Sequence, residues 1–248
     1  VSFIGVFLAL IVLEVLFLVL VSLPVDPYKD REKASPFFRA LAKLYIDLAL
    51  TILPVRLHTT GLEKMPKTGR VLLVSNHVHE IDPAIFLRYF PQKQFAFVAK
   101  RETRDMFLVN KFLSKLLCPF INRENDREAL KAILQSIKLL KEDVASVGIF
   151  PEGRICDERK LQQLKPGVFK IAQKAEVPIV VCTAKNTRYI FGNAKKLKPT
   201  EVYIDVVDVL YPDSFQGQTA VELGHRVYEM MAEHMGPEYV YHPLDSEE

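Results

Sequence analysis

A histidine and an aspartate that follow an apolar run are the residues best suited to chemistry in this sequence. His77 and Asp82 lie five positions apart in the segment NHVHEIDP, directly after the apolar run 71–75. On a helix these two side chains would be about 140° apart, and on a strand they would lie on opposite faces. They can meet only if the chain turns between them, and the Asp-Pro pair at 82–83 is typical of a helix start after such a turn.

A carboxylate bound to one imidazole nitrogen fixes the tautomer and makes the other nitrogen a better base. We therefore predict that Asp82 orients His77 as a general base. No serine or cysteine lies in a nucleophile-elbow motif, so we expect the base to act directly on a substrate hydroxyl. Three other interpretations stay open: His77 could be a structural histidine, Asp82 could cap a helix, and His77, His79 and Asp82 could bind a metal ion.

A second motif, FPEGR at 150–154, follows the next strongly apolar run. A strand that opens into Pro-Glu-Gly makes a tight turn that can expose backbone N–H groups. The guanidinium of Arg154 is a planar fork suited to phosphate. Taken alone, the motif could equally be an ordinary glycine turn with a solvated arginine.

Together, the His-x4-Asp pattern at 77–82 and the FPEGR motif resemble the glycerolipid acyltransferase family, and within it the 1-acyl-glycerol-3-phosphate acyltransferases. Two more segments fit in the same order. FINR at 120–123 resembles a block that usually reads FIDR, and VPIV at 177–180 resembles a fourth block. The resemblance covers residues 55–210.

The resemblance implies that His77 is the general base of an acyl transfer and that Asp82 orients it. It assigns binding of the glycerol phosphate to five residues: Lys100, Arg123, Glu152, Gly153 and Arg154. The implied acceptor is lysophosphatidic acid and the implied product is phosphatidic acid. The acyl donor is a thioester of acyl carrier protein or coenzyme A, and no cofactor or metal is implied.

Two departures from the family pattern leave the exact acceptor open. Asn122 replaces the usual Asp, and Ile155 follows Arg154 directly, whereas many members have Thr between the Gly and the Arg. Glycerol-3-phosphate or another lysophospholipid is the alternative acceptor. From other classes of protein, a metal-dependent hydrolase and a non-catalytic lipid-binding protein also stay open.

Strands alternate with helices over residues 55–236, which predicts an α/β domain with a mainly parallel central sheet flanked by helices. Strands are expected at Val55–Thr59, Val71–Ser75, Phe95–Ala99, Val144–Phe150, Ile179–Thr183 and Glu201–Leu210. Helices are expected at Asn125–Lys141, Gly167–Lys174 and Thr219–Met235, before a C-terminal tail at 237–248. In such sheets the ligand site lies beyond the carboxyl ends of the strands.

Residues 1–54 predict a two-helix segment associated with the lipid bilayer. The run Val1–Leu23 is apolar and long enough to span a bilayer core, although Glu14 is costly in lipid. Two helices that dip into one leaflet are the alternative. Ser35-Pro36 marks the second helix start. Its polar residues form one narrow stripe, Arg39, Lys43, Asp47 and Thr51. We expect this helix to lie in the membrane interface; a helix buried in the core is the alternative.

Basic residues follow the first apolar run, which places that side, and the catalytic domain, on the cytoplasmic face of the cell membrane. The formal net charge is only +3, which argues against a nucleic-acid-binding protein. The three cysteines, Cys118, Cys156 and Cys182, match no zinc or disulfide pattern and indicate a reducing compartment.

Overall fold

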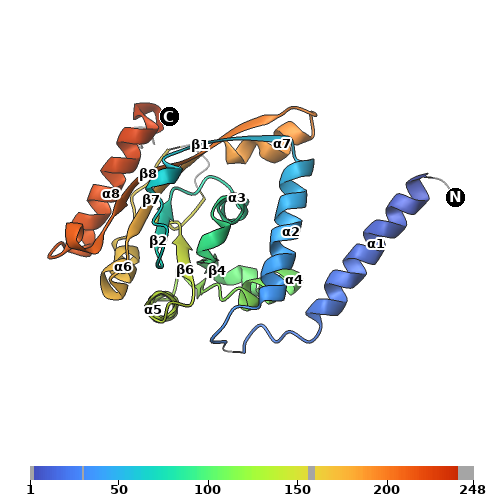
Figure 1. Ribbon diagram of the computed structural model, residues 1–248, viewed down its shortest axis with the longest axis horizontal. Coiled ribbons are helices and arrows are strands. Elements are labelled where there is room, and N and C mark those ends of the chain that lie inside the picture. The colour runs from blue at the N-terminus through green and yellow to red at the C-terminus, as the bar shows by residue number, and fades with distance from the viewer. Residues whose placement is uncertain (1–2, 30, 156–159, 240–248) are drawn as a thin grey trace.

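The computed structural model describes residues 3–29, 31–155 and 160–239, and these form a central sheet with helices on both faces (Figure 1). The six strands of the sheet lie in the order β1-β8-β7-β2-β6-β3. Their bounds are β1 Val55–Thr60, β2 Leu72–Ser75, β3 Phe95–Phe97, β6 Ser146–Ile149, β7 Ile179–Lys185 and β8 Thr200–Leu210. A smaller sheet pairs β4 (Ala99–Lys100) with β5 (Phe120–Ile121).

The sheet is mainly parallel, as the sequence predicts. β2 lies parallel to both β6 and β7, β3 is parallel to β6, and β1 is parallel to β8. Among the strands of the described residues, β7 and β8 form the one antiparallel pair, so β1 and β8 run opposite to the other four strands of the main sheet. All four residues of β2 are buried, because the strand is covered on both faces.

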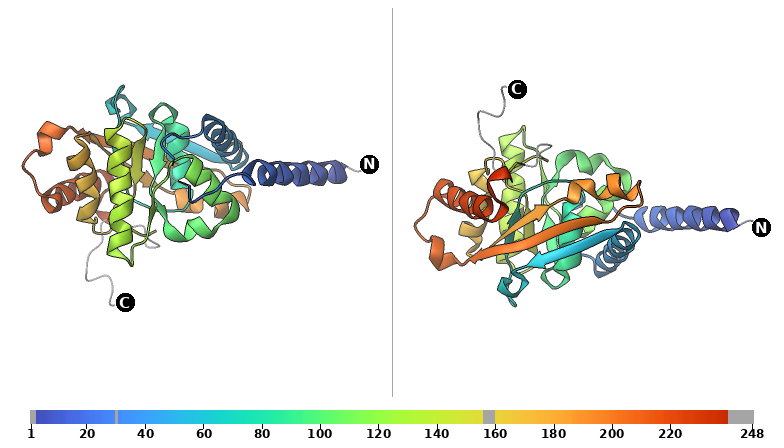
Figure 2. Two further views of the ribbon diagram at one scale, coloured as in Figure 1. Left: turned by 90° about the horizontal axis from the view of Figure 1, so that it is seen from below. Right: turned by 90° about the horizontal axis from the view of Figure 1, so that it is seen from above.

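Two groups of helices cover the two faces. On one face, Leu72 and Val74 of β2 join a core formed with α5 (Asp126–Lys141), α6 (Phe169–Ala175) and α8 (Ala220–Met235). On the other face, Leu73 joins a core formed with α2 (Pro36–Ile52), α3 (Asp82–Tyr89) and α7 (Ile190–Ala194). Two further helices, α1 (Phe3–Ser22) and α4 (Phe107–Lys115), lie at the same end of the molecule as α2 (Figures 1 and 2).

The predicted helix starts are confirmed by their caps. The side chain of Asn125 accepts a hydrogen bond from the backbone of Glu128 and begins α5. Thr219 and Glu222 exchange hydrogen bonds in a capping box that begins α8. Ser35 accepts from the backbone of Phe38 at the start of α2.

Helix α2 is half core and half exposed surface. Phe38, Leu41 and Leu50 are buried against the domain, whereas Leu44 and Leu48 on the outer side are 60% and 51% exposed. The predicted polar stripe does not simply face water, since Asp47 pairs with Arg88 of α3 at 3.2 Å. The core interpretation therefore holds for the inner side of this helix, and the membrane interpretation of its outer side stays a prediction.

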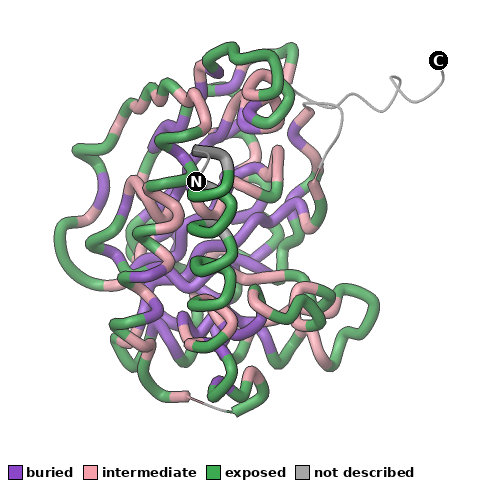
Figure 3. Tube along the Cα trace, turned by 90° about the vertical axis from the view of Figure 1, so that its right-hand side faces the viewer, coloured by how far each residue is buried: buried purple, intermediate pink, exposed green. Residues whose placement is uncertain are grey.

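Helix α1 projects from the body of the protein (Figure 2) and its described side chains are mostly exposed along its length (Figure 3). The sequence predicts a run long enough to span a bilayer. Within the described ranges, however, none of the helices combines the length and apolarity needed to cross a membrane.

Two of the three cysteines, Cys118 and Cys182, are buried as free thiols. Cys156 and most of the predicted C-terminal tail lie outside the described residues.

Candidate active site

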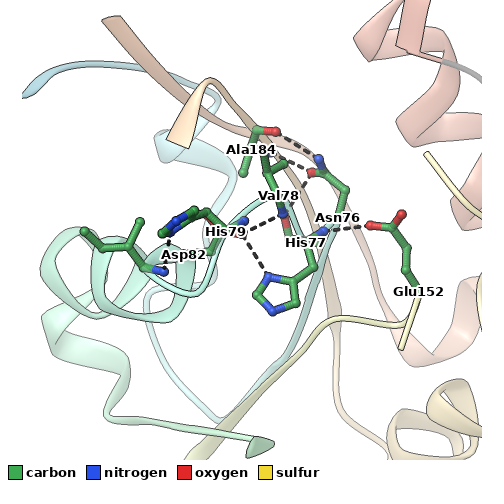
Figure 4. A network of polar contacts seen from close by, with 9 residues as sticks. Asn76, His77, Val78, His79, Asp82, Glu152 and Ala184 are labelled. Carbon is green, nitrogen blue, oxygen red and sulfur yellow. Dashed lines mark hydrogen bonds and ion pairs between the residues drawn. The ribbon is translucent and has the colours of Figure 1, made fainter. Parts of the chain in front are cut away.

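The chain turns between β2 and α3, and this turn brings the predicted histidine and aspartate together (Figure 4). His77 Nδ1 lies 2.9 Å from Asp82 Oδ2. The Asp82 side chain is fully buried and that of His77 is 14% exposed. Nε2 of His77 has no hydrogen-bond partner among the described residues, so it is the nitrogen left for a substrate.

Asp82 is not the cap of α3. Its Oδ2 accepts hydrogen bonds from the backbone N–H groups of Val78 at 2.8 Å and His79 at 2.9 Å, both upstream of the helix. The N-cap position belongs to Ile81, which makes no side-chain cap bond. The carboxylate therefore holds the turn and the imidazole at once, which fixes the direction of the His77 ring.

Asn76 anchors the same turn to the sheet. Its side-chain amide donates to the carbonyl of Ala184 at 2.9 Å and its oxygen accepts from the N–H of Ala184 at 2.7 Å. This paired bond joins the end of β2 to β7, so the residue before His77 is fixed on a buried strand.

Glu152 reaches the turn from the end of β6. Its Oε1 accepts from the backbone N–H of His77 at 2.7 Å and its Oε2 accepts from the backbone N–H of Gln162 at 2.9 Å. The side chain is only 5% exposed. A buried carboxylate that accepts two backbone bonds is strongly held, and the two motifs thereby become one site.

Phe150 packs against one face of the His77 imidazole. The rings of His77 and Phe150 are stacked, and Phe150 also stacks with Phe97 at a centroid distance of 5.7 Å. Gly148 permits this packing, because a Cβ there would lie 2.3 Å from the ring of Phe97.

The glycine of the second motif makes the expected tight turn. Gly153 has φ +77°, which favours glycine, and its N–H donates to the carbonyl of Phe150 at 3.1 Å. That N–H is therefore used within the turn, although the sequence predicts a turn that can expose its backbone N–H groups. Arg154 is exposed at this turn, and its Nη2 donates to the side chain of Gln162 at 3.0 Å.

Of the remaining two predicted cations, Lys100 lies on the small sheet and Arg123 lies in the turn just after it. Lys100 ends β4 and is paired with Ile121 of β5, two residues before Arg123. Lys100 forms an ion pair with Glu102 at 3.4 Å. Partial desolvation lowers the pKa of Arg123, and the nearby Glu102 opposes that shift. Among the described residues no hydrogen bond or ion pair joins these two cations to His77 or Arg154, whereas His77, Asp82, Glu152 and Arg154 form one connected network through Gln162.

His79 makes its contacts away from the His77–Asp82 pair. Its Nδ1 accepts from the backbone of Ile81 at 3.2 Å, and its ring lies 5.4 Å from that of Phe191. In Figure 4 the rings of His77 and His79 point in different directions. Over residues 3–29, 31–155 and 160–239, no three His, Cys, Asp or Glu side chains are grouped so that they could hold a metal ion. The geometry gives no support to the metal site that the sequence left open.

Comparison with known proteins agrees with this geometry. A sequence model of the acyltransferase family matches residues 56–185, more than half of the chain. The chain belongs to the acyltransferase family. The match contains both motifs of this acyltransferase and every residue of the network around His77.

Individual relatives give a finer picture. The acyltransferase is 30% identical to the 1-acyl-sn-glycerol-3-phosphate acyltransferase of Borreliella burgdorferi over 72% of each chain. It is also 30% identical to a Mycoplasma pneumoniae protein named "Probable 1-acyl-sn-glycerol-3-phosphate acyltransferase", over 79% of this chain and 75% of the relative.

A solved structure is similar over most of the chain. The crystal structure of the 1-acyl-sn-glycerophosphate (LPA) acyltransferase PlsC from Thermotoga maritima has a TM-score of 0.67 and 25% identity. The similarity covers 88% of this acyltransferase and 85% of that chain.

Sequence reasoning missed three contributors to the site. Asn76 stands beside His77 in the motif, but its bond to Ala184 depends on the pairing of β2 with β7. Phe150 begins the second motif, and only the fold places its ring under His77. The contact of Gln162 with Arg154 had no signal in the sequence.

Proposed function

We propose that this acyltransferase moves a fatty acyl group from an acyl thioester to the 2-hydroxyl of 1-acyl-glycerol-3-phosphate, and that the product is phosphatidic acid. The observation that carries the proposal is the His77–Asp82 pair, in which Asp82 binds Nδ1 and Nε2 stays open to a substrate hydroxyl. The names of the relatives support the choice of acceptor.

In the proposed mechanism, Nε2 of His77 removes the proton of the acceptor hydroxyl as its oxygen attacks the thioester carbonyl. The imidazolium that forms is stabilised by the carboxylate of Asp82. The tetrahedral intermediate then collapses with cleavage of the carbon–sulfur bond. His77 returns the proton to the departing thiolate, so the enzyme ends in its starting state.

Arginine and lysine side chains near the strand ends position the acceptor in this proposal. Arg154 lies at the turn that Glu152 ties to His77, and its fork suits a phosphate. Lys100 and Arg123 add positive charge at the ends of β4 and β5. A phosphate held at a fixed distance from Nε2 places the hydroxyl for attack, which can contribute much of the rate.

We further propose that α1 and the outer side of α2 lie in one leaflet of the cell membrane, with the catalytic domain on the cytoplasmic face. Leu13 and Leu20 of α1 are 61% and 55% exposed, and Leu44 of α2 is 60% exposed. Exposed apolar area on this scale marks an interaction surface. The acceptor and the product of the proposed reaction are both membrane lipids.

A transfer assay with purified full-length protein tests the proposal. Lysophosphatidic acid, glycerol-3-phosphate and lysophosphatidylcholine are each offered with acyl-coenzyme A or with acyl-acyl carrier protein, and products are identified by mass spectrometry. Formation of phosphatidic acid from lysophosphatidic acid at the highest kcat/KM supports the proposal, with the His77→Ala protein as blank. Faster acylation of another acceptor, or equal product with His77→Ala, contradicts it.

A further inference from the structure

Helix α4 has an inverted distribution of polarity. The residues of α4 that are buried are all polar: Asn110, Lys111 and Ser114. Its apolar residues at the N-terminal end are exposed instead, with Met106 at the N-cap and Phe107 each 52% exposed and Val109 38% exposed. We call these three residues the α4 edge. A helix of a water-soluble domain normally buries its apolar stripe, so exposed apolar and buried polar residues together indicate a non-aqueous environment outside.

The buried polar residues have structural reasons for their position. Lys111 Nζ donates to the carbonyls of Ser22 at 2.9 Å and Val25 at 3.0 Å. These carbonyls lie at the C-terminal end of α1, where a cation is favourable. Asn110 donates to the carbonyl of Arg104 at 2.7 Å. The polar side chains of Asn110 and Lys111 therefore join α4 to its neighbours, whereas the three exposed residues of the α4 edge lie on the outside.

These bonds place the α4 edge beside the two N-terminal helices. Lys111 fixes α4 to the end of α1, and the rings of Phe112 and Phe38 pack edge to face at 5.1 Å to fix it to α2. Figures 1 and 2 show α1, α2 and α4 at the same end of the molecule. Exposed apolar residues of α1, α2 and the α4 edge therefore lie at the same end of the molecule.

Cations lie next to this apolar surface. The 3-10 helix η3 (Arg101–Asp105) joins Lys100 directly to Met106. The side chains of Lys100 and Arg101 stay 59% and 58% exposed although they pair with Glu102 at 3.4 Å and Glu128 at 3.7 Å, and residues 100–105 carry three cations against two carboxylates. Tyr28, which is 62% exposed, lies under the guanidinium of Arg104 at 4.7 Å. Apolar and aromatic side chains beside exposed cations match an anionic bilayer surface, in which lipid tails lie below charged headgroups.

We propose that the α4 edge is a third membrane-contact surface, which docks the catalytic domain onto an anionic lipid bilayer. Met106, the first residue of the α4 edge, lies six residues beyond Lys100, so the bilayer would meet the domain next to the segment that carries Lys100 and Arg101. This inference rests on the proposed membrane location of α1 and α2 and assigns a lipid contact to the catalytic domain itself.

The absence of tryptophan from the chain allows a direct test. Phe107→Trp introduces a single fluorophore and keeps an aromatic ring over Lys111, whose Nζ lies 5.0 Å from the Phe107 ring centroid. Val221→Trp is the matched control, because Val221 is 64% exposed and lies on α8, away from α1 and α2 (Figure 1). Each protein is titrated with vesicles of phosphatidylcholine and phosphatidylglycerol, with and without bromine in the acyl chains.

We expect the emission of Trp at position 107 to shift to the blue and to be quenched by brominated tails, while Trp at position 221 shows neither change. Unshifted, unquenched emission at position 107 from protein that is bound to the vesicles overturns the inference. A blue shift that grows with protein concentration in the absence of vesicles also overturns it, because it identifies a second copy of the chain as the occupant.

A second pair of variants tests the energetic contribution. Met106→Asp puts a carboxylate into the α4 edge at an N-cap position, where aspartate is favourable for the helix. Val221→Asp makes the same change near the start of α8. Met106→Asp should weaken vesicle binding about tenfold, with Tm unchanged and full activity on a water-soluble short-chain acceptor. Equal vesicle binding by the two variants rejects the membrane contact of the α4 edge. An unsubstituted protein that acylates none of the acceptors rejects the proposed function instead.

Discussion

The imidazole ring of His77 lies flat on the ring of Phe150, with centroids 4.1 Å apart and an angle of 11° between the planes. This contact and the Asp82 hydrogen bond hold the ring in two perpendicular directions. The hydrogen bond to Asp82 fixes rotation of the imidazole within its plane, and stacking on Phe150 fixes the plane itself. Nε2, the nitrogen that we propose as the general base, is thus positioned before substrate binds, which is the condition for efficient proton transfer.

Replacing Phe150 by Leu keeps most of the apolar volume but removes the flat surface. We expect kcat to fall by about tenfold, since the imidazole loses one restraint, and KM for the acceptor to stay nearly constant. Steady-state kinetics and a thermal melt check this. Phe97→Leu is the control, because Phe97 stacks on Phe150, whereas the ring that stacks on His77 is that of Phe150. Equal losses of kcat in the two variants would show a general packing effect.

Replacing Asp82 by Asn tests the charge with little change of shape. Oδ1 of Asp82 is buried without a hydrogen-bond partner among the described residues. The amide nitrogen of Asn can occupy that position while its oxygen still accepts the bonds of the turn. We expect kcat to fall by roughly two orders of magnitude or more, because the imidazolium loses its carboxylate. Circular dichroism should show a folded protein; wild-type kcat would remove Asp82 from the mechanism.

Replacing Arg154 by Lys keeps the charge and loses the bidentate fork. We predict that KM for lysophosphatidic acid rises about tenfold, while KM for the thioester donor changes little. Gln162→Ala is informative beside it, since Gln162 holds Arg154 at 3.0 Å and its bond to Glu152 uses only the backbone. It should produce a smaller rise. If neither KM nor kcat for the acceptor changes in Arg154→Lys, the phosphate lies elsewhere.

Placing Asp at both Leu44 and Leu48 tests the outer side of α2. These side chains are 60% and 51% exposed, so the substitutions leave the core intact. Vesicle binding should fall at least tenfold, with the detergent Tm almost unchanged. Leu41→Asp is the contrast, because Leu41 is 8% exposed and burying an unpaired carboxylate is strongly destabilising. A large fall in Tm for the double variant would instead identify α2 as a core helix on both sides.

Much of the fold could be predicted from periodicity and boundary residues. The apolar runs that became β2 and β7 are buried on both faces of the sheet, which is why they carry no alternation. Helix α5 and helix α8 begin at polar caps that the sequence shows directly. The His77–Asp82 contact was predictable because the Asp-Pro pair at 82–83 indicates a helix start, and therefore a turn that brings the two side chains together.

The region between β4 and β5 could not be predicted in the same way. Helix α4 buries Asn110, Lys111 and Ser114 and exposes apolar residues, so its hydrophobic pattern does not report which side faces the core. The antiparallel direction of β8 beside β7 could not be predicted either, because it depends on how two strands pair and not on the residues of one strand. The role of Glu152 depends on two backbone N–H groups from distant segments, and no side-chain pattern encodes such partners.

The position of β8 between β1 and β7 has a consequence for the order in which the chain can fold. In the main sheet β1 pairs only with β8, and Thr60 is bonded to Asp205 across a separation of 145 residues. A ribosome therefore releases β1 early, and its hydrogen-bonding edge has no sheet partner until β8 emerges. Closing so long a loop is slow compared with local helix formation. The edge of β1 thus stays open until β8 closes the sheet, and an open strand edge is a site where a folding chain can pair wrongly.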